Sequence, residues 1–121
     1  SIAKQQYPAH LMEVIVVDDH SEDNTAQIVL QYQSTLPSLA LIYLKDHLKG
    51  NSINAYKKKA IEIAIAEAKG NWIVTTDADC TMGSNWLNLL AAYIQQYQPV
   101  LVAAPVVFEK KNSLLGNFQL L

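Results

Sequence analysis

Two pairs of carboxylates stand where apolar runs end. The stretch VTTDADC leads from apolar residues into Asp77 and Asp79, and the run MEVIVVDD ends on Asp18 and Asp19. Carboxylates gathered in one place repel one another unless a cation or hydrogen-bond donors offset their charge. Mg²⁺ and Mn²⁺ do so with oxygen ligands and often bring a phosphate with them. The two pairs are therefore the first candidates for a metal and phosphate site.

Each pair taken alone has a simpler explanation. A lone D-x-D tripeptide more often solvates a loop or caps a helix, and Asp18 with Asp19 would by itself indicate a turn and a helix cap. In open α/β sheets, however, ligands bind beyond the carboxyl ends of the strands. Two acidic pairs at the ends of two parallel strands would meet in one crevice, which favours a shared site.

The apolar patterns predict an α/β domain with an open parallel sheet in the order β-α-β-α-β-α-β. Strands are expected over residues 12–19, 39–44, 71–77 and 100–108. Helices are expected from a cap at Asp23 or Asn24 to Pro37, over residues 53–70, and from Ser84 to about Gln96. The buried face of helix 53–70 is predicted from helical spacing to hold Tyr56, Ala60, Ile61, Ala64, Ile65 and Ala68. That of the last helix is predicted to hold Leu87, Leu90, Ala91 and Ile94.

Three consecutive lysines, residues 57–59, stand at the start of helix 53–70. Cations at a helix N-terminus oppose the macrodipole, and an anionic ligand would relieve that conflict. We therefore predict that one of these lysines reaches a phosphate. At least one of them is expected to be solvated, and Lys58 is also placed to pair with Glu62 at i,i+4. His20 is interpreted as a loop residue, with metal ligation as the alternative.

Composition narrows the classes of function. The chain of 121 residues fits one domain, residues 1–121, and its net charge of −2 gives no electrostatic case for nucleic acid. All nine basic residues are lysines, so the chain offers no bidentate guanidinium clamp for phosphate. The single cysteine, Cys80, excludes an internal disulfide and fits the reducing cytosol. We find no signal peptide and no apolar run long enough to span a membrane.

Taken together, four blocks resemble the inverting family 2 glycosyltransferases, which have the GT-A fold and include cellulose, chitin and hyaluronan synthases and many bacterial polysaccharide enzymes. The blocks are QQYP, EVIVVDDHSEDNT, YKKKAIEIAIAEAKG and TTDADC, which follow one another between residues 5 and 80. The resemblance implies a Rossmann-like, mostly parallel sheet with flanking helices. It also implies transfer of a sugar from a nucleotide-diphosphate sugar, with a UDP-sugar expected, to a sugar or lipid-linked acceptor.

Carried over to this chain, the resemblance gives the site residues their roles. Asp18 and Asp19 match the pair that contacts the base and ribose of the donor. Lys57 or Lys58 matches the lysine near the donor. Asp77 and Asp79 match the D-x-D motif, which holds the Mn²⁺ or Mg²⁺ that bridges the donor diphosphate, and Asp79 is the better candidate for direct metal contact.

The chain departs from the family pattern in three respects. His20 replaces the usual glycine after the first acidic pair. The first family strand is expected before Ser1, and the catalytic base and any Q-x-x-R-W motif beyond Leu121, so no catalytic base is assigned, not even to Glu109. We therefore expect a piece of a larger cytoplasmic protein, truncated at both ends and not active alone. Association of the intact protein with the cytoplasmic face of the membrane is left open.

Three other classes compete with this interpretation. A receiver domain of a response regulator shares the acidic pair after its first strand, but Asp77 lies too far along the chain from Asp19 for its phospho-accepting residue. A sugar-nucleotide nucleotidyltransferase shares the fold, but its Gly-rich phosphate loop with arginine and lysine is absent here. A non-catalytic structural domain is disfavoured by the clustered acids at strand ends.

Overall fold

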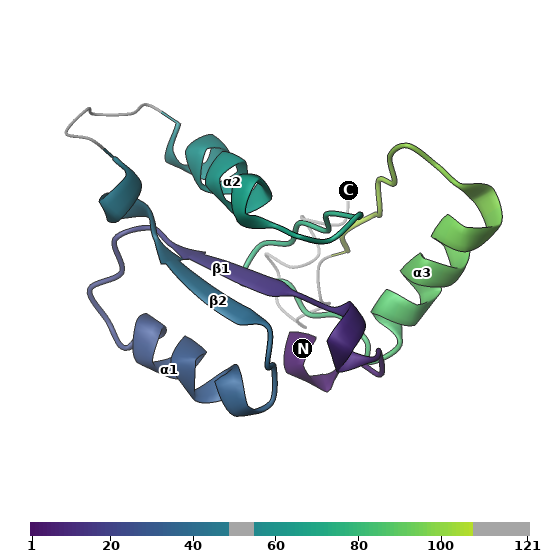
Figure 1. Ribbon diagram of the computed structural model, residues 1–121, viewed down its shortest axis with the longest axis horizontal. Helices are drawn as coiled ribbons and strands as arrows, with labels where there is room; N and C mark the ends of the chain where they lie inside the picture. The colour runs from purple at the N-terminus through teal and green to yellow at the C-terminus, as the bar shows by residue number, and fades with distance from the viewer. Residues whose placement is uncertain (49–54, 108–121) are drawn as a thin grey trace, which may run out of the picture. The chain divides into compact units, whose positions relative to one another are not determined.

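The computed structural model describes residues 1–48 and 55–107 of the chain. Two compact units divide it, Ser1–Ala91 and Ala92–Leu121. The helices and strands, shown in Figure 1, are β1 (Val14–Asp18), α1 (Thr25–Gln31), β2 (Leu39–Tyr43), α2 (Tyr56–Glu67) and α3 (Trp86–Tyr97). The described residues also contain four short 3₁₀ helices: η1 (Ile2–Lys4), η2 (Ala9–Leu11), η3 (Tyr32–Ser34) and η4 (Leu44–His47).

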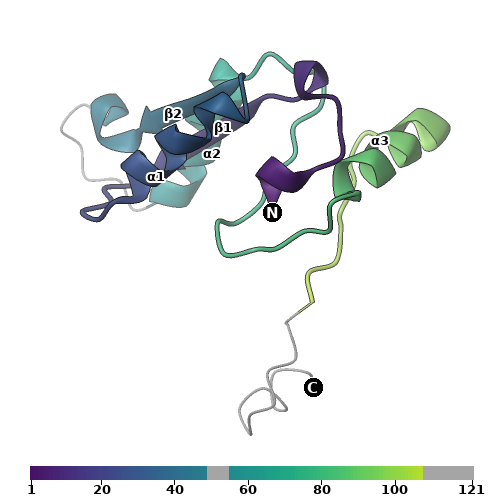
Figure 2. The same cartoon turned by 90° about the horizontal axis from the view of Figure 1, so that it is seen from below.

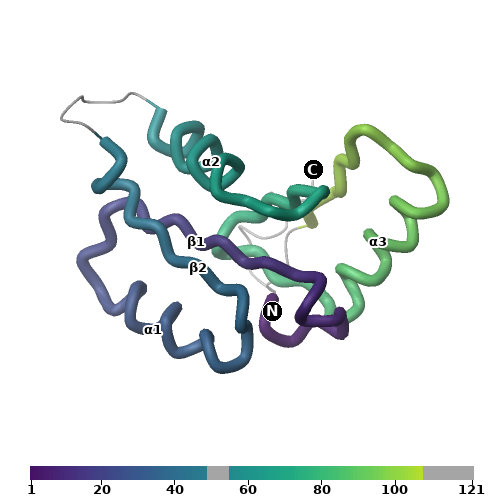
Figure 3. The backbone as a smooth tube through the Cα atoms, viewed as in Figure 1, coloured from purple at the N-terminus to yellow at the C-terminus, as the bar shows by residue number. Residues whose placement is uncertain are grey.

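A parallel pair of strands lies at the centre of the first unit. β1 and β2 run side by side in the same direction (Figure 3), with Val14 opposite Leu39 and Asp18 opposite Tyr43. Their β-branched and aliphatic residues favour the pleated conformation. A parallel pair needs a crossover connection, and α1 lies in that connection. The strands run between α1 and α2 in Figure 1. The first two predicted strands and the α/β class are thus confirmed.

α1 begins where the sequence predicted a cap. Asn24 stands at the N-cap position without a side-chain bond, and Asp23 takes the capping role instead. The carboxylate of Asp23 accepts hydrogen bonds from both the backbone N–H and the hydroxyl of Thr25. These hydrogen bonds, the hydroxyl bond first, lower the pKa of Asp23. An ionised side chain at this end of the helix is also favoured by the macrodipole.

The buried face of α2 differs from the predicted one. Ile63 is the buried residue of this helix, whereas Ile61 and Ile65, which were assigned to the core, are exposed. Tyr56 is exposed as well, at 39%. Ala60 and Ala64 are partly buried beside Ile63, so the contact stripe has the spacing i, i+3, i+4. Isoleucines at every second position offered two faces of similar apolarity, and packing against β1 selected the one that holds Ile63.

Two predicted strands are wrong within the described residues. No strand forms over 71–77 or 100–107, and Figure 3 traces both segments as irregular chain. Trp72, Ile73 and Val74 are each more than 40% exposed. A β-branched run has the propensity for a strand, but a strand also needs a partner for its N–H and C=O groups. In the described residues β1 and β2 pair only with each other, and Pro105 removes a donor from the later run.

The core of the described residues is small. Leu44, which follows β2, is fully buried, and Leu36 and Ile63 are 7% and 8% exposed. Burial of a leucine side chain such as Leu44 contributes about 2 kcal/mol. This core fixes the carboxyl end of β2, because Leu44 directly follows its last residue.

The last helix has the predicted polarity. Leu87, Leu90, Ala91 and Ile94 are partly buried, while Leu89, Tyr93 and Tyr97 on the other side of α3 are 64%, 46% and 60% exposed. Among the helices of residues 1–48 and 55–107, none is both long and apolar enough to cross a membrane.

Candidate functional site

The first acidic pair ends β1, and its two members lie in different environments. Asp18 is the last residue of the strand and is only 5% exposed. Its Oδ1 accepts a hydrogen bond from the backbone N–H of Ser21 at 2.9 Å, so it also holds the loop that follows. Asp19 is half-exposed, and its carboxylate is accessible to a ligand. The buried acid therefore shapes the loop, and the accessible one faces solvent.

His20 holds Asp19 in place. Its Nδ1 lies 2.8 Å from Asp19 Oδ1, and its ring meets the ring of Tyr56 edge-on, with centroids 6.0 Å apart and an interplanar angle of 83°. The backbone of His20 has a φ of 61°, in the left-handed region that glycine adopts most easily. This backbone conformation explains why the family pattern has glycine here. The interpretation of His20 as a plain loop residue is therefore incomplete.

The second acidic pair meets the start of α2. The ammonium of Lys57 donates a hydrogen bond to Asp77 Oδ1 at 2.7 Å. The backbone N–H of Cys80 bonds the carbonyl of Asp77 at 3.2 Å, which closes a turn around Asp79. The hydrogen bond to Asp77, then its charge and to a smaller extent that of Asp79, raises the pKa of Lys57. Lys57 thus carries a full positive charge at neutral pH beside both carboxylates of the motif.

The structure distinguishes between the three lysines. Lys57 contacts the acidic motif, whereas Lys58 is exposed. Glu62 pairs with Lys59 at 3.2 Å and i,i+3, so the predicted pairing with Lys58 is wrong. Residues at i,i+3 and i,i+4 both lie on the same helix face. Lys59, at i,i+3, is the lysine that is partly buried there.

The first turn of α2 connects the two acidic pairs. Tyr56 contacts His20 from the first acidic loop, and its neighbour Lys57 contacts Asp77 from the second. Two adjacent residues therefore bring together loops that lie about 58 residues apart in sequence. The first turn of α2 thus contacts both acidic loops, although the predicted third strand does not form, and convergence of the two acidic pairs on one crevice stays a prediction.

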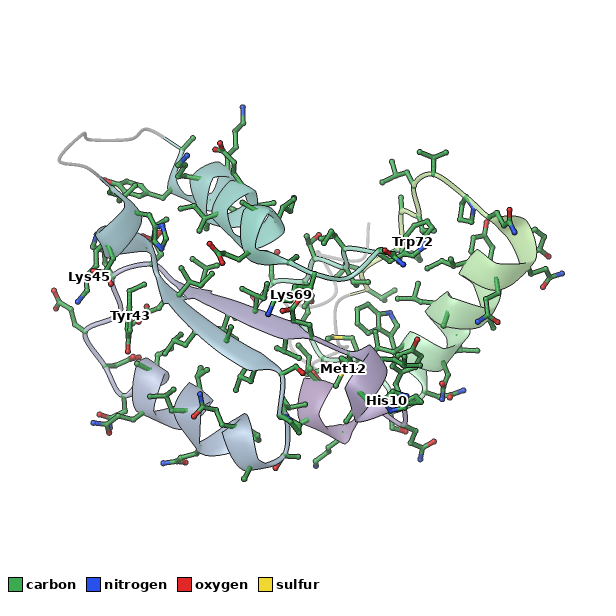
Figure 4. All side chains as sticks on the ribbon, in the orientation of Figure 1. His10, Met12, Tyr43, Lys45, Lys69 and Trp72 are labelled. Atoms are coloured by element: carbon green, nitrogen blue, oxygen red, sulfur yellow. The ribbon has the colours of Figure 1, made fainter. Side chains whose placement is uncertain are left out.

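Positive charge also lies at the carboxyl end of the sheet. Tyr43 is the strand partner of Asp18, and the ammonium of Lys45 lies 5.4 Å from the centre of its ring. Figure 4 shows this pair at one end of the strands and His10 and Met12 at the other. A cation over an aromatic face is held there by the ring quadrupole.

The QQYP block has a structural role that sequence reasoning missed. Gln5 donates from Nε2 to the carbonyl of Gly83 at 2.8 Å and accepts the N–H of Leu87 at 3.1 Å. The N–H of Gln6 bonds the carbonyl of Ser84 at 2.7 Å. Figures 1 and 2 both show the N-terminal segment beside the start of α3. The glutamines thus anchor the chain that follows the D-x-D motif.

The carboxylates of Asp77 and Asp79 suit a hard divalent cation by their chemistry. Magnesium in proteins is commonly held by one or two carboxylates together with substrate phosphates and water. Within residues 1–48 and 55–107, no three His, Cys, Asp or Glu side chains gather as a complete metal site. The two carboxylates fit the group only as part of a shared site, with the remaining ligands coming from a phosphorylated ligand and solvent.

Comparison with known proteins places this geometry in a family. The sequence model of glycosyl transferase family 2 matches residues 1–118. An uncharacterized glycosyltransferase of Mycoplasma pneumoniae is 36% identical over 97 residues, which are 79% of this chain and 30% of that protein. The poly(ribitol-phosphate) β-N-acetylglucosaminyltransferase TarS of Staphylococcus aureus is 33% identical over 97 residues, 80% of this chain and 16% of that protein.

A solved structure shows the same fold. The crystal structure of Staphylococcus aureus TarS residues 1–349, in complex with UDP, matches with a TM-score of 0.68 and 33% identity over 80% of this chain and 27% of that one. This chain therefore spans less than a third of each of these relatives. The comparisons confirm the GT-A fold and support neither the receiver-domain nor the nucleotidyltransferase alternative. The chain belongs to glycosyl transferase family 2.

Proposed function

We propose that this chain binds a nucleotide-diphosphate sugar, with UDP as the nucleotide, and that the protein transfers the sugar to an acceptor. The observation that carries the proposal is the first turn of α2, where Tyr56 meets the loop of Asp19 and Lys57 meets Asp77. The TarS structure, which contains UDP, supports the choice of nucleotide.

Each of these residues is proposed to contact, or to position a contact with, one part of the donor. Asp19 accepts hydrogen bonds from the nucleoside, since a carboxylate is a pure acceptor and ribose hydroxyls and base N–H groups are donors. Asp18 is buried and holds the loop that presents Asp19. Lys57 carries the charge that attracts the diphosphate. Lys58 is a solvated neighbour that adds to the positive field.

Asp77 and Asp79 are the proposed ligands of a divalent cation, Mn²⁺ or Mg²⁺, with Asp79 as the direct ligand. Such a cation, when bound, offsets the negative charge of the departing nucleoside diphosphate. The Lys57 ammonium already balances one of these carboxylates. It therefore holds the Asp77 side chain in place before a ligand arrives.

The catalytic base and the acceptor are not assigned to any residue of this chain. Glu109, the one acid that follows Asp79, lies outside the described residues. The cytoplasmic location and an association with the membrane face stay predictions. Because TarS is named as an N-acetylglucosaminyltransferase, UDP-N-acetylglucosamine is the first donor to test.

Calorimetric titration with UDP, with and without Mn²⁺, tests the proposal. We expect binding that Mn²⁺ strengthens and that Asp79→Ala abolishes. Glu67→Gln is the matched control, because Glu67 is an exposed acid in the last turn of the same helix that starts with Lys57. Equal binding by Asp79→Ala would refute the role of Asp79, and absence of UDP binding by the unaltered protein would refute the proposed donor.

A further inference from the structure

We propose that His20 is a positioning residue: it fixes the orientation of Asp19 toward the nucleoside and joins the first acidic loop to α2 through Tyr56. This inference rests on the proposed function, because it concerns how Asp19 meets the donor. The observations behind it are the left-handed backbone of His20, its hydrogen bond to Asp19 and its ring contact with Tyr56.

The backbone shows that the histidine is not the most stable choice at this position. A φ of 61° costs free energy for a residue with a Cβ, and glycine removes that cost. The bond from Ser21 N–H to Asp18 holds the loop in a shape that makes position 20 left-handed. Histidine is tolerated in this region better than most residues. Tolerance of the left-handed backbone does not, however, explain why the His20 side chain contacts both Asp19 and Tyr56.

The hydrogen bond assigns the donor role to Nδ1 of the ring. A carboxylate only accepts, so the imidazole must carry its proton on Nδ1 to bond Asp19 Oδ1. One oxygen of Asp19 is thereby occupied and the other is left for a ligand. Both side chains are 49% exposed, so solvent screens the pair and its effect on folding stability is small. Its main effect is to restrict the rotamers of Asp19 before the donor binds.

The ring of His20 is in turn held by Tyr56. An edge-on pair at 6.0 Å and 83° is a favoured aromatic geometry. Because Tyr56 precedes Lys57, this contact ties the orientation of Asp19 to the helix turn that contacts Asp77. The nucleoside and diphosphate parts of the site are thus held by one rigid element.

His20→Gly separates the two effects by their signs. The variant relieves the left-handed backbone, so its melting temperature should stay the same or rise by a few degrees. It also removes the hold on Asp19, so its Kd for UDP should rise about three- to tenfold. A purely structural residue would lower stability and affinity together. His10→Ala is the control, because His10 is exposed and precedes the amino end of β1, opposite the site.

His20→Asn tests the hydrogen bond itself. Asparagine tolerates the left-handed region and places an amide N–H near the position of Nδ1. We expect it to recover most of the affinity that His20→Gly loses. Tyr56→Leu, which removes the ring contact, should weaken UDP binding less than His20→Gly does.

A double-mutant cycle in the protein decides whether His20 acts through Asp19. If it does, His20→Gly weakens UDP binding in the unaltered background and has no further effect in Asp19→Ala. Additive losses would overturn the inference, and so would UDP binding by His20→Gly equal to that of the unaltered protein. Failure of the unaltered protein to bind UDP would overturn the proposed function and this inference together, whereas the two preceding outcomes would overturn this inference and leave the proposed function standing.

Discussion

The anchoring of the α3 start by Gln5 can be tested through stability. Gln5→Ala removes two hydrogen bonds, one to the carbonyl of Gly83 and one from the N–H of Leu87. Leu87 is the second residue of α3, so its N–H lacks a partner within the helix. A net hydrogen bond contributes about 0.5–1.5 kcal/mol. Since one of the two is partly buried and the other exposed, we expect a loss of about 1–2 kcal/mol in the free energy of unfolding.

Urea unfolding followed by circular dichroism measures this loss. Gln5→Glu keeps the acceptor for Leu87 N–H and places a negative charge near a helix N-terminus, but it removes the donor to Gly83. We therefore expect about half the loss. Gln33→Ala is the control, because Gln33 is exposed in η3, and it should change stability by less than about 0.5 kcal/mol. If the free energy of unfolding of Gln5→Ala lies within about 0.5 kcal/mol of that of the unaltered protein, the anchoring role of Gln5 is refuted.

Three further predictions test the role of Lys57, the contact between Glu13 and the chain that follows α2, and the contact between Asp23 and Thr25 at the start of α1. Lys57→Ala should weaken UDP binding about tenfold and Lys58→Ala less than about twofold, as measured by calorimetry; equal effects would refute the distinction between them. Glu13→Ala should lower the free energy of unfolding by about 1 kcal/mol, because the Glu13 carboxylate accepts a hydrogen bond at 2.9 Å from the backbone N–H of Lys69, just beyond the end of α2. Glu13→Gln should lose less stability in the same urea titration. Thr25→Val should raise the pKa of Asp23 toward its ordinary value, as followed by carboxyl NMR, because the hydroxyl bond is the main cause of its lowering. A carboxyl whose pKa is lowered in the folded state stabilises the fold at pH values above its unfolded pKa, and this stabilisation is lost as pH falls through the folded pKa. The variant should therefore be less stable than the unaltered protein at neutral pH, and the difference should shrink as pH falls below about 4.

Local patterns were enough to predict the elements that contact their neighbours in sequence order. β1 and β2 are short β-branched or aliphatic runs joined by one crossover helix, and they pair as expected. The run 71–77 has a similar pattern but no strand partner among the described residues, so propensity could not decide its state. In α2, isoleucines on two faces left the buried one undetermined, and contact with the sheet selected Ile63.

The site residues were predictable to the extent that charge and strand ends locate them. Asp18 ends β1, as expected from the rule that ligands bind beyond the carboxyl ends of parallel strands, whereas Asp77 follows no strand among the described residues. The choice of Lys57 over Lys58 depends on the helix rotation, which the sequence does not give. The role of Gln5 was missed because an amide side chain has no characteristic spacing or charge. Its signal was present only as part of the QQYP block.

The three lysines at the start of α2 pose an electrostatic conflict that the site resolves. The helix has no acidic residue in its first turn, so its own sequence does nothing to offset the positive end of the macrodipole. Asp77 supplies the missing negative charge from another part of the chain, at 2.7 Å from Lys57. A diphosphate brings more negative charge than one carboxylate does. A bound diphosphate would therefore add to the charge compensation that Asp77 begins, so we expect the positive charge of Lys57 to contribute to donor affinity in addition to its ion pair with Asp77.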